Sequence, residues 1–172
     1  MWLLRGLLDR VLLIAAVVAG GLVPGFIAQY RQRLGGRLDQ ARLDLEPWQK
    51  LADQQHHGDL GALVRYHLES SDPTFHAEGG VIASLADTVR QLQSAADALH
   101  SSLWQQVLYL ARHADPALIR ATYADWVPTF ALSGEGLMFA LVFALGVWLL
   151  FQGLWALLTW LAQARPGRRR YA

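Results

Sequence analysis

Two long stretches of this sequence contain no charged residue, and they constrain its fold more than any other feature. They cover residues 11–28 and 136–162. At a helical rise of about 1.5 Å per residue they reach about 27 Å and about 40 Å, whereas the hydrocarbon layer of a bilayer is about 30 Å thick. The sequence therefore predicts two transmembrane helices.

Arginines lie next to one end of each stretch, and in a chain that crosses a membrane twice these two ends lie on the same side of the membrane. Arg5 and Arg10 precede the first stretch, and Arg165 follows the second. Because basic residues beside a span tend to stay in the cytoplasm, we predict a bacterial inner-membrane protein with both termini cytoplasmic and the intervening segment periplasmic. Aromatic and basic residues are enriched at membrane interfaces, where we expect Trp2, Phe26, Trp126, Phe130, Trp160, Arg168, Arg169 and Arg170.

The first stretch also has features of a cleavable signal peptide, because it follows a charged start and contains several small residues between positions 15 and 21. Its apolar character continues through Leu22 and Ile27, beyond the core of about 7 to 15 residues that a signal peptide usually has. We therefore expect an uncleaved anchor.

Small residues at helical spacing let two helices approach closely in lipid. The spans carry such residues at Ala16, Gly20, Gly136, Ala140 and Ala144. Gln152 is polar within the second span, and we expect it to bond a backbone carbonyl of the first span; a contact with another subunit, a lipid or a quinone headgroup is the alternative. Pro24 and Gly25 should kink or end the first helix.

The segment between the spans is mildly acidic. From residue 29 to residue 130 it holds nine Arg or Lys against twelve Asp or Glu, a balance of −3. A segment with this net negative charge lacks the basic surface that binds nucleic-acid phosphates, so we expect no nucleic-acid partner. The chain has no cysteine, which excludes disulfides, thiolate metal sites and thiol catalysis.

Two apolar seams in this segment have an average period of 3.5 residues, as packed helices require. The first seam is Leu34, Leu38, Ala41, Leu45, Trp48 and Ala52. The second, which we expect to form a helix-packing or partner interface, is Leu85, Val89, Leu92, Ala96, Leu99 and Leu103. It predicts one long helix over residues 81–112. Pro47 should bend or restart the first helix. Shorter helices are expected over residues 59–69, with Asp59 as an acidic cap, and over residues 117–126, capped by Asp115 and started by Pro116.

The predicted fold is therefore all-α, with two transmembrane helices bracketing an extramembrane helical hairpin or small coiled-coil-like bundle. Its expected parts are the N-terminal end with the first span (1–28), a periplasmic helical domain (29–130), the second span (131–164) and a basic cytoplasmic tail (165–172).

Histidines are the first residues to consider as metal ligands. His56, His57 and His67 lie within twelve residues, but they lack His-x-x-x-His or His-Glu-x-x-His spacing, and zinc sites usually need three or four convergent ligands. They are weak candidates, and we expect solvated loop histidines. The carboxylates are spread along helices and no nucleophile motif is present, so we predict no catalytic residue, no cofactor and no enzymatic activity.

Several short motifs follow one another in a set order along the chain. They are Val23-Pro24-Gly25-Phe26 with Gln29-Tyr30, then Tyr66-His67, then Ser71-Asp72-Pro73 with Phe75, and finally Ala114-Asp115-Pro116. In this order the chain resembles a family of short proteobacterial inner-membrane proteins catalogued only as a domain of unknown function. The resemblance implies a Gram-negative inner-membrane protein with a helical central domain, and it assigns no catalytic residue.

The leading functional hypothesis is a non-enzymatic membrane protein whose periplasmic helices mediate self-assembly or serve as an accessory or scaffold subunit of a membrane complex. Docking would use the seam from Leu85 to Leu103. The expected partners are membrane lipids and either further copies of the chain or other membrane-protein subunits.

Two alternatives remain open. One is a site for a lipid or a small hydrophobic ligand where the spans meet the domain, around Phe26, Tyr30, Trp126 and Phe130. The other is a metal sensor that uses the three clustered histidines.

Overall fold

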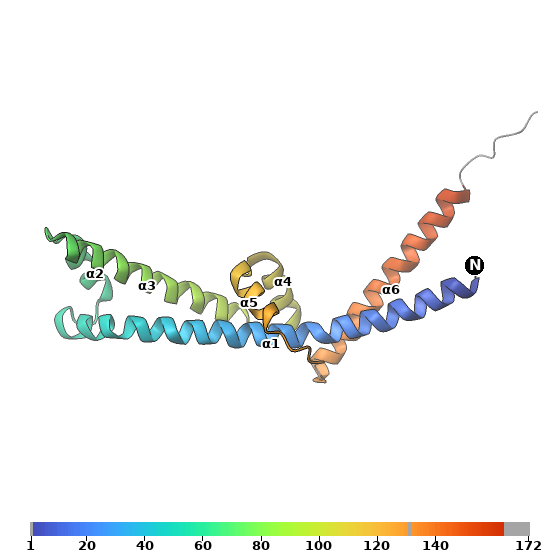
Figure 1. Cartoon of the computed structure of the whole chain (residues 1–172), viewed down its shortest axis with the longest axis horizontal. Helices are drawn as coiled ribbons and strands as arrows, with labels where there is room; N and C mark the ends of the chain where they lie inside the picture. The colour runs from blue at the N-terminus through green and yellow to red at the C-terminus, as the bar shows by residue number, and fades with distance from the viewer. Residues whose placement is uncertain (1, 131, 164–172) are drawn as a thin grey trace, which may run out of the picture. The chain divides into compact units, whose positions relative to one another are not determined.

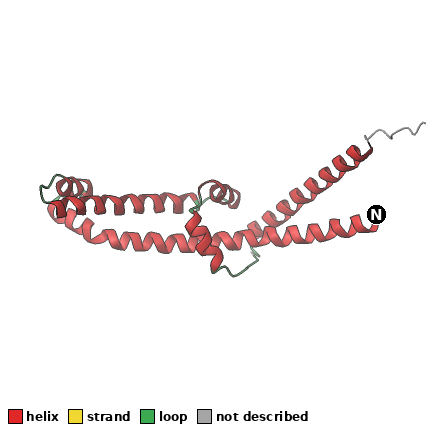
Figure 2. Cartoon of the chain, turned by 45° about the horizontal axis from the view of Figure 1, so that its top comes forward, coloured by secondary structure: helices red, strands yellow, loops and turns green. Residues whose placement is uncertain are grey.

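The structure, a computed structural model, describes residues 2–130 and 132–163, with side chains placed for 5–130 and 132–161. This part of the chain forms six helices and no strand (Figure 1, Figure 2). They are α1 (Trp2–Gln55), α2 (Leu60–Leu68), α3 (Pro73–Ala98), α4 (Leu103–His113), α5 (Pro116–Ala124) and α6 (Gly134–Gln163). The all-helical class predicted from the sequence is therefore confirmed.

The chain divides into two compact units. The first, which we call the span unit, comprises Met1–Phe26 and Val127–Ala172, and the second, the helical domain, comprises Ile27–Trp126. Helix α1 contributes to both units, because it begins at Trp2 and ends at Gln55. The chain therefore enters and leaves the helical domain through the span unit.

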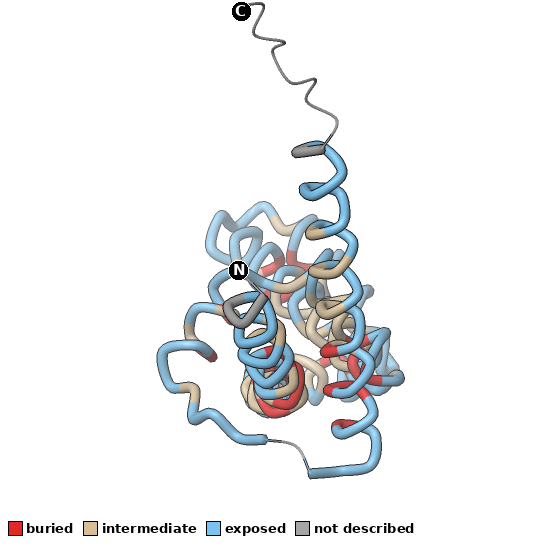
Figure 3. Tube along the Cα trace, turned by 90° about the vertical axis from the view of Figure 1, so that its right-hand side faces the viewer, coloured by how far each residue is buried: buried red, intermediate tan, exposed pale blue. Residues whose placement is uncertain are grey.

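Helices α1 and α6 are both long and apolar enough to cross a membrane. Within their most apolar windows, only 28% and 17% of the residues are buried inside the chain. Along α6, which leads to the C-terminus, exposed positions predominate (Figure 3). A core helix of a soluble protein would instead be mostly buried, so these two helices expose an unusually apolar surface.

The helix end predicted at Pro24–Gly25 and the restart predicted at Pro47 are wrong, because α1 continues through both prolines. The kink and the bend given as alternatives stay predictions. A proline inside a helix costs about 3 kcal/mol, since it removes a backbone donor and crowds the preceding turn. Packing on either side opposes this cost: Gly25 and Ile27 are buried after Pro24, and Ala52 is fully buried after Pro47. Tertiary contacts therefore override the local preference.

In the helical domain, α3 lies beside the second half of α1 (Figure 1). The centre of its core is a buried cluster of Tyr30 and Leu34 from α1, Leu99 from the end of α3, and Leu118 from α5. The side chains that pack against this cluster include Leu92, Ala96, Tyr109, Leu110 and Ile119. Leu34 of the first seam and Leu92, Ala96 and Leu99 of the second therefore pack together within one chain at this cluster.

The single helix predicted over residues 81–112 is wrong, because α3 ends at Ala98 and α4 begins at Leu103. Ser102 occupies the N-cap of α4, and its backbone N–H donates to Gln105 Oε1 at 3.1 Å. Ser101 Oγ donates to the Ala98 carbonyl at 2.8 Å. The Ser-x-x-Gln pattern is a capping-box signal, and here it outweighs the continuous apolar period.

Helices α2, α3 and α5 each begin directly after an aspartate. Asp59 accepts from the Ala62 N–H at 3.0 Å at the start of α2, and Asp72 accepts from the Thr74 N–H at 2.7 Å at the start of α3. The helix expected over residues 117–126 is α5, which begins at Pro116 and ends at Ala124. Each aspartate satisfies a backbone donor that has no partner within its helix.

Candidate functional site

Polar side chains of α1 and α6 form a network in the span unit. Asp9 Oδ1 accepts hydrogen bonds from Trp148 Nε1 at 2.9 Å and from Gln152 Nε2 at 3.0 Å. Arg5 donates to Gln152 Oε1 at 3.1 Å, and its guanidinium carbon lies 5.4 Å from the centroid of the Trp155 ring. We call Arg5, Asp9, Trp148 and Gln152 the span network. It satisfies polar groups that would be costly to leave unpaired in lipid.

The predicted partner of Gln152 is therefore wrong, because Gln152 bonds two side chains and not a backbone carbonyl. Asp9 precedes the uncharged stretch by two residues, so the sequence pattern places it outside the span. Its pairing with Gln152 depends on how α1 and α6 align, which no local signal reports.

The five small residues singled out from the sequence lie at buried positions in the span unit: Ala16, Gly20, Gly136, Ala140 and Ala144. A Cβ atom added to Gly20 would stand 3.0 Å from the Ala140 Cα, so the two helices approach closely at this point. This arrangement agrees with the role of small residues in packing helices within lipid.

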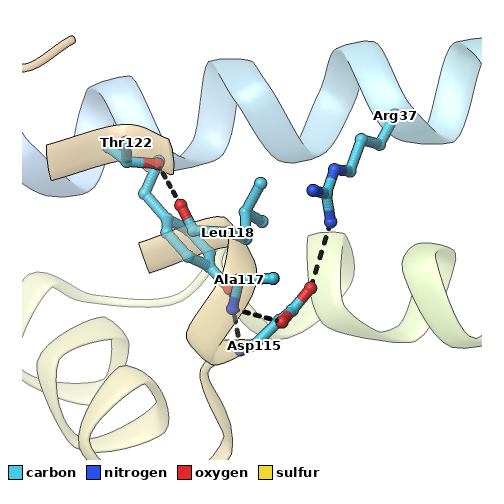
Figure 4. Close-up of polar contacts among 6 residues, drawn as sticks. Arg37, Asp115, Ala117, Leu118 and Thr122 are labelled. Carbon is cyan, nitrogen blue, oxygen red and sulfur yellow. Dashed lines mark hydrogen bonds and ion pairs between the residues drawn. The ribbon is translucent and has the colours of Figure 1, made fainter. Parts of the chain in front are cut away.

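Asp115 links α5 to α1 in the helical domain (Figure 4). Its carboxylate accepts from the Ala117 N–H at 2.8 Å and pairs with Arg37 Nη1 at 3.0 Å. Its backbone N–H donates to Tyr30 Oη at 3.4 Å. The Ala117 N–H is the largest of the influences that lower the pKa of Asp115, and Arg37 adds to them. Asp115 is thus held as a carboxylate that caps α5.

This pKa shift predicts an acid-sensitive contribution to stability. Because the pKa of Asp115 is lowered in the folded chain, its carboxylate stabilises the fold above the unfolded pKa of about 3.9, and that contribution is lost as the pH falls through the folded pKa. We expect Asp115→Asn, which keeps an N-cap side chain, to lose less helicity than the wild type below about pH 4. Far-UV circular dichroism measures this, and Asp87→Asn, at a carboxylate that caps no helix, should lose helicity to the same extent as the wild type.

Aromatic and histidine side chains gather where α2 meets α1 and the start of α3. The His67 ring is 4% exposed, and its centroid lies 5.5 Å from that of Phe75, 5.8 Å from that of Tyr66 and 6.1 Å from that of Trp48. The His56 ring lies 5.6 Å from Tyr66. We call these five residues the α2 cluster.

Contacts of the two His67 ring nitrogens hold the centre of the α2 cluster. His67 Nδ1 lies 2.9 Å from the Leu63 carbonyl oxygen, and His67 Nε2 lies 3.8 Å from a carboxylate oxygen of Glu78 on α3. Around this fixed ring, Tyr66 is 63% exposed and Phe75 is 46% exposed. The cluster therefore exposes two large aromatic side chains, Tyr66 and Phe75, which pack against the buried His67 ring.

The three histidines proposed as weak metal candidates are not brought together as ligands. His57 is exposed in the turn after α1, with a φ of 52°, whereas His67 is buried. Over residues 2–130 and 132–163, no three His, Cys, Asp or Glu side chains group as metal ligands. The metal-sensor alternative therefore gains no support from their arrangement.

The remaining predicted site residues fall into three groups. In the second seam, Leu85, Val89, Leu92 and Ala96 are half-buried, whereas Leu99 and Leu103 are buried. Among the aromatic residues expected at the interfaces, Phe26 and Trp126 are half-buried, whereas Phe130 and Trp160 are exposed. The side chain of Trp2 and the arginines at 168, 169 and 170 lie outside the described residues.

Tyr30, expected to line a lipid site, is instead part of the core of the helical domain. It is 3% exposed, and burial is the main cause of the raised pKa of its hydroxyl. Its ring packs in the cluster with Leu34 and Leu99, so Tyr30 offers no ligand surface.

A comparison with protein-family models matches residues 4–164 to DUF2937, described as a protein of unknown function. The chain belongs to this family. The DUF2937 match includes the whole helical domain, all of α6 and most of α1, so the span network and the α2 cluster lie within it. The expected resemblance to a domain of unknown function is confirmed. No curated protein and no solved structure matches the chain.

Proposed function

We propose that this DUF2937 protein is a non-enzymatic, two-span inner-membrane protein whose helical domain mediates assembly. The domain docks onto further copies of the chain or serves as an accessory or scaffold subunit of a membrane complex. Helices α1 and α6 cross the bilayer with both termini in the cytoplasm, and the helical domain lies in the periplasm between the two spans.

The exposed apolar surface of α6 supports the membrane assignment. Its large exposed side chains include Leu137, Met138, Leu141, Leu145, Leu149, Leu150, Leu154 and Leu157. These positions follow one another along the helix, and water would not favour such a surface on a monomer. Lipid contacts stabilise it without requiring a protein partner.

The use of the polar groups in the helical domain supports a structural role. Asp59, Asp72 and Asp115 each accept a backbone hydrogen bond at the start of a helix. The pKa values of Asp59 and Asp115 are lowered, chiefly by those bonds. A carboxyl group that acts as a general acid or base near neutral pH needs a raised pKa, closer to the working pH.

The α2 cluster carries the docking proposal. The second seam packs within the chain, so the docking surface proposed from the sequence moves to Tyr66 and Phe75. Both are exposed aromatic side chains supported by the buried His67 ring. Tyr and Phe are enriched in protein interfaces, and Tyr is also enriched among the residues that contribute most of the binding energy.

The test compares aromatic residues inside and outside the cluster. Crosslinking in native membranes and native mass spectrometry would measure the assembled fraction. We expect Tyr66→Ala with Phe75→Ala to weaken assembly at least about tenfold. Tyr123→Ala removes a comparably exposed side chain from α5 and should leave assembly unchanged. A monomeric wild type, or equal losses in both variants, would contradict the proposal.

A further inference from the structure

A groove with a volume of about 500 Å³ lies between α1 and α3 in the helical domain. Ligand pockets commonly have volumes of about 300 to 1,000 Å³. Buried Leu34, Leu38 and Leu99 form part of its floor. The polar side chains that line it are Arg31, Gln32, Arg42, Gln93 and His100. The groove therefore combines a short apolar floor with several hydrogen-bond donors.

Gly35 keeps the middle of the groove open. A Cβ atom added there would have no neighbouring atom within 4 Å, so the space above Gly35 is empty of protein. Gly36, the next residue, has equally open surroundings but does not line the groove. The two glycines thus provide a site variant and a matched control on the same helix.

Arg31 differs from the neighbouring arginines of α1 in its charge partner. Arg33, Arg37 and Arg42 have aspartate oxygens at 2.5, 3.0 and 3.8 Å respectively. Within the described residues, Arg31 has no carboxylate at ion-pair distance, and its Nη2 lies 3.5 Å from His100 Nδ1. No acidic side chain lines the groove. An anion that contacts both Arg31 and His100 would meet a cation that is not already neutralised.

The position of Arg31 along α1 indicates which anion reaches it. Ala28, at one end of the groove, is the last residue of the uncharged stretch 11–28. Arg31 is three residues further, a rise of about 4.5 Å. The headgroup layer on each side of the hydrocarbon is about 5 to 7 Å thick. If α1 crosses the bilayer as proposed above, Arg31 lies at the depth of the phosphates.

We propose that this groove binds the headgroup of an anionic phospholipid. The phosphate contacts both Arg31 and His100 from the open side of the groove, because a guanidinium binds phosphate oxygens through paired hydrogen bonds. The polar headgroup extends over Gly35 toward Gln32 and Gln93, while the acyl chains stay in the bilayer. This inference rests on the proposed membrane crossing of α1 and is independent of the assembly role.

Binding of phosphatidylglycerol to the full chain tests the proposal. Native mass spectrometry of the detergent-solubilised protein counts bound lipids, with phosphatidylcholine as the zwitterionic comparison. We expect one retained phosphatidylglycerol and an affinity about tenfold above that for phosphatidylcholine. Arg31→Gln removes the cation and Gly35→Leu fills the groove, and each should weaken binding about tenfold.

Two controls separate the groove from general attraction to a basic surface. Arg120→Gln removes a charge from α5, and Gly36→Leu adds the same side chain one residue away; both should bind as the wild type does. Equal losses in the site and control variants would overturn the proposal, as would wild-type binding by Gly35→Leu. Circular dichroism verifies that every variant is folded.

A competition experiment distinguishes binding of a lipid headgroup from binding of free phosphate. Retention of phosphatidylglycerol in a large excess of inorganic phosphate supports the lipid assignment, whereas its displacement by phosphate would overturn it. Because lipid binding is scored on the monomeric chain, its failure leaves the Tyr66 and Phe75 assembly test intact. Failure of assembly likewise leaves this test intact.

Discussion

Replacing Gly25 with alanine is expected to destabilise the span unit severely. Gly25 is buried in α1, and a Cβ atom there would lie well inside 3.0 Å of both the carbonyl oxygen and Oγ1 of Thr129. The Thr129 hydroxyl can rotate away, but its backbone oxygen cannot. Relief therefore requires the segment at residue 129 or the helix itself to move.

The expected sign is opposite to that of helix propensity. Alanine in place of glycine inside a helix would by itself stabilise by about 1 kcal/mol. Overpacking a closely packed site costs about 1 to 3 kcal/mol, and a clash with backbone belongs at the upper end of that range. We therefore expect Gly25→Ala to lower the free energy of unfolding by about 2 kcal/mol in detergent, measured from denaturation followed by circular dichroism.

Gly146→Ala provides the control for this prediction. Gly146 lies in α6 of the same unit, and a Cβ atom there would have no neighbour within 4 Å. The same chemical change should leave stability unchanged or slightly raised. Equal stability of Gly25→Ala and the wild type would show that α1 and residue 129 do not approach as described.

The second large effect is expected at Asp9. Asp9→Ala removes the oxygen that accepts from both the Trp148 indole and the Gln152 amide. Each donor left without a partner away from water costs about 1 to 3 kcal/mol. We therefore expect a loss of about 2 to 4 kcal/mol in the free energy of unfolding, together with a changed tryptophan fluorescence spectrum.

Asparagine separates hydrogen bonding from charge at this position. Asp9→Asn retains one side-chain oxygen, so it should recover much of the stability that alanine loses. If alanine and asparagine are equally well tolerated, the span network does not stabilise the packing of α1 on α6.

Local signals in the sequence were sufficient for several elements. Asp59 and Asp115 predict the starts of α2 and α5, because each stands directly before a helical segment and can satisfy a free backbone N–H. The four-residue spacing of Leu34 and Leu38 indicates that both lie on one packing face of a helix. These signals act within a few residues, and the structure contains the corresponding features.

Other local signals were outweighed by packing or by a stronger local signal. Pro24 and Pro47 indicate breaks that α1 does not have, because buried residues on both sides hold the helix together. At Ser102 the sequence predicted a continuous helix where the structure has two. The apolar period continues through this position, but a capping box at Ser102 begins a new helix. The seam position Leu99 is buried at the resulting corner.

The sequence by itself determined the two apolar helices, the amphipathic seams and the helix caps, because hydropathy, period and capping depend on neighbouring residues. Only the tertiary structure decided that Asp9 meets Gln152, that Tyr66 and Phe75 surround a buried His67, and that Gly35 lies over an open groove. These features depend on residues that are distant in the chain, and their contacts follow from the alignment of whole helices.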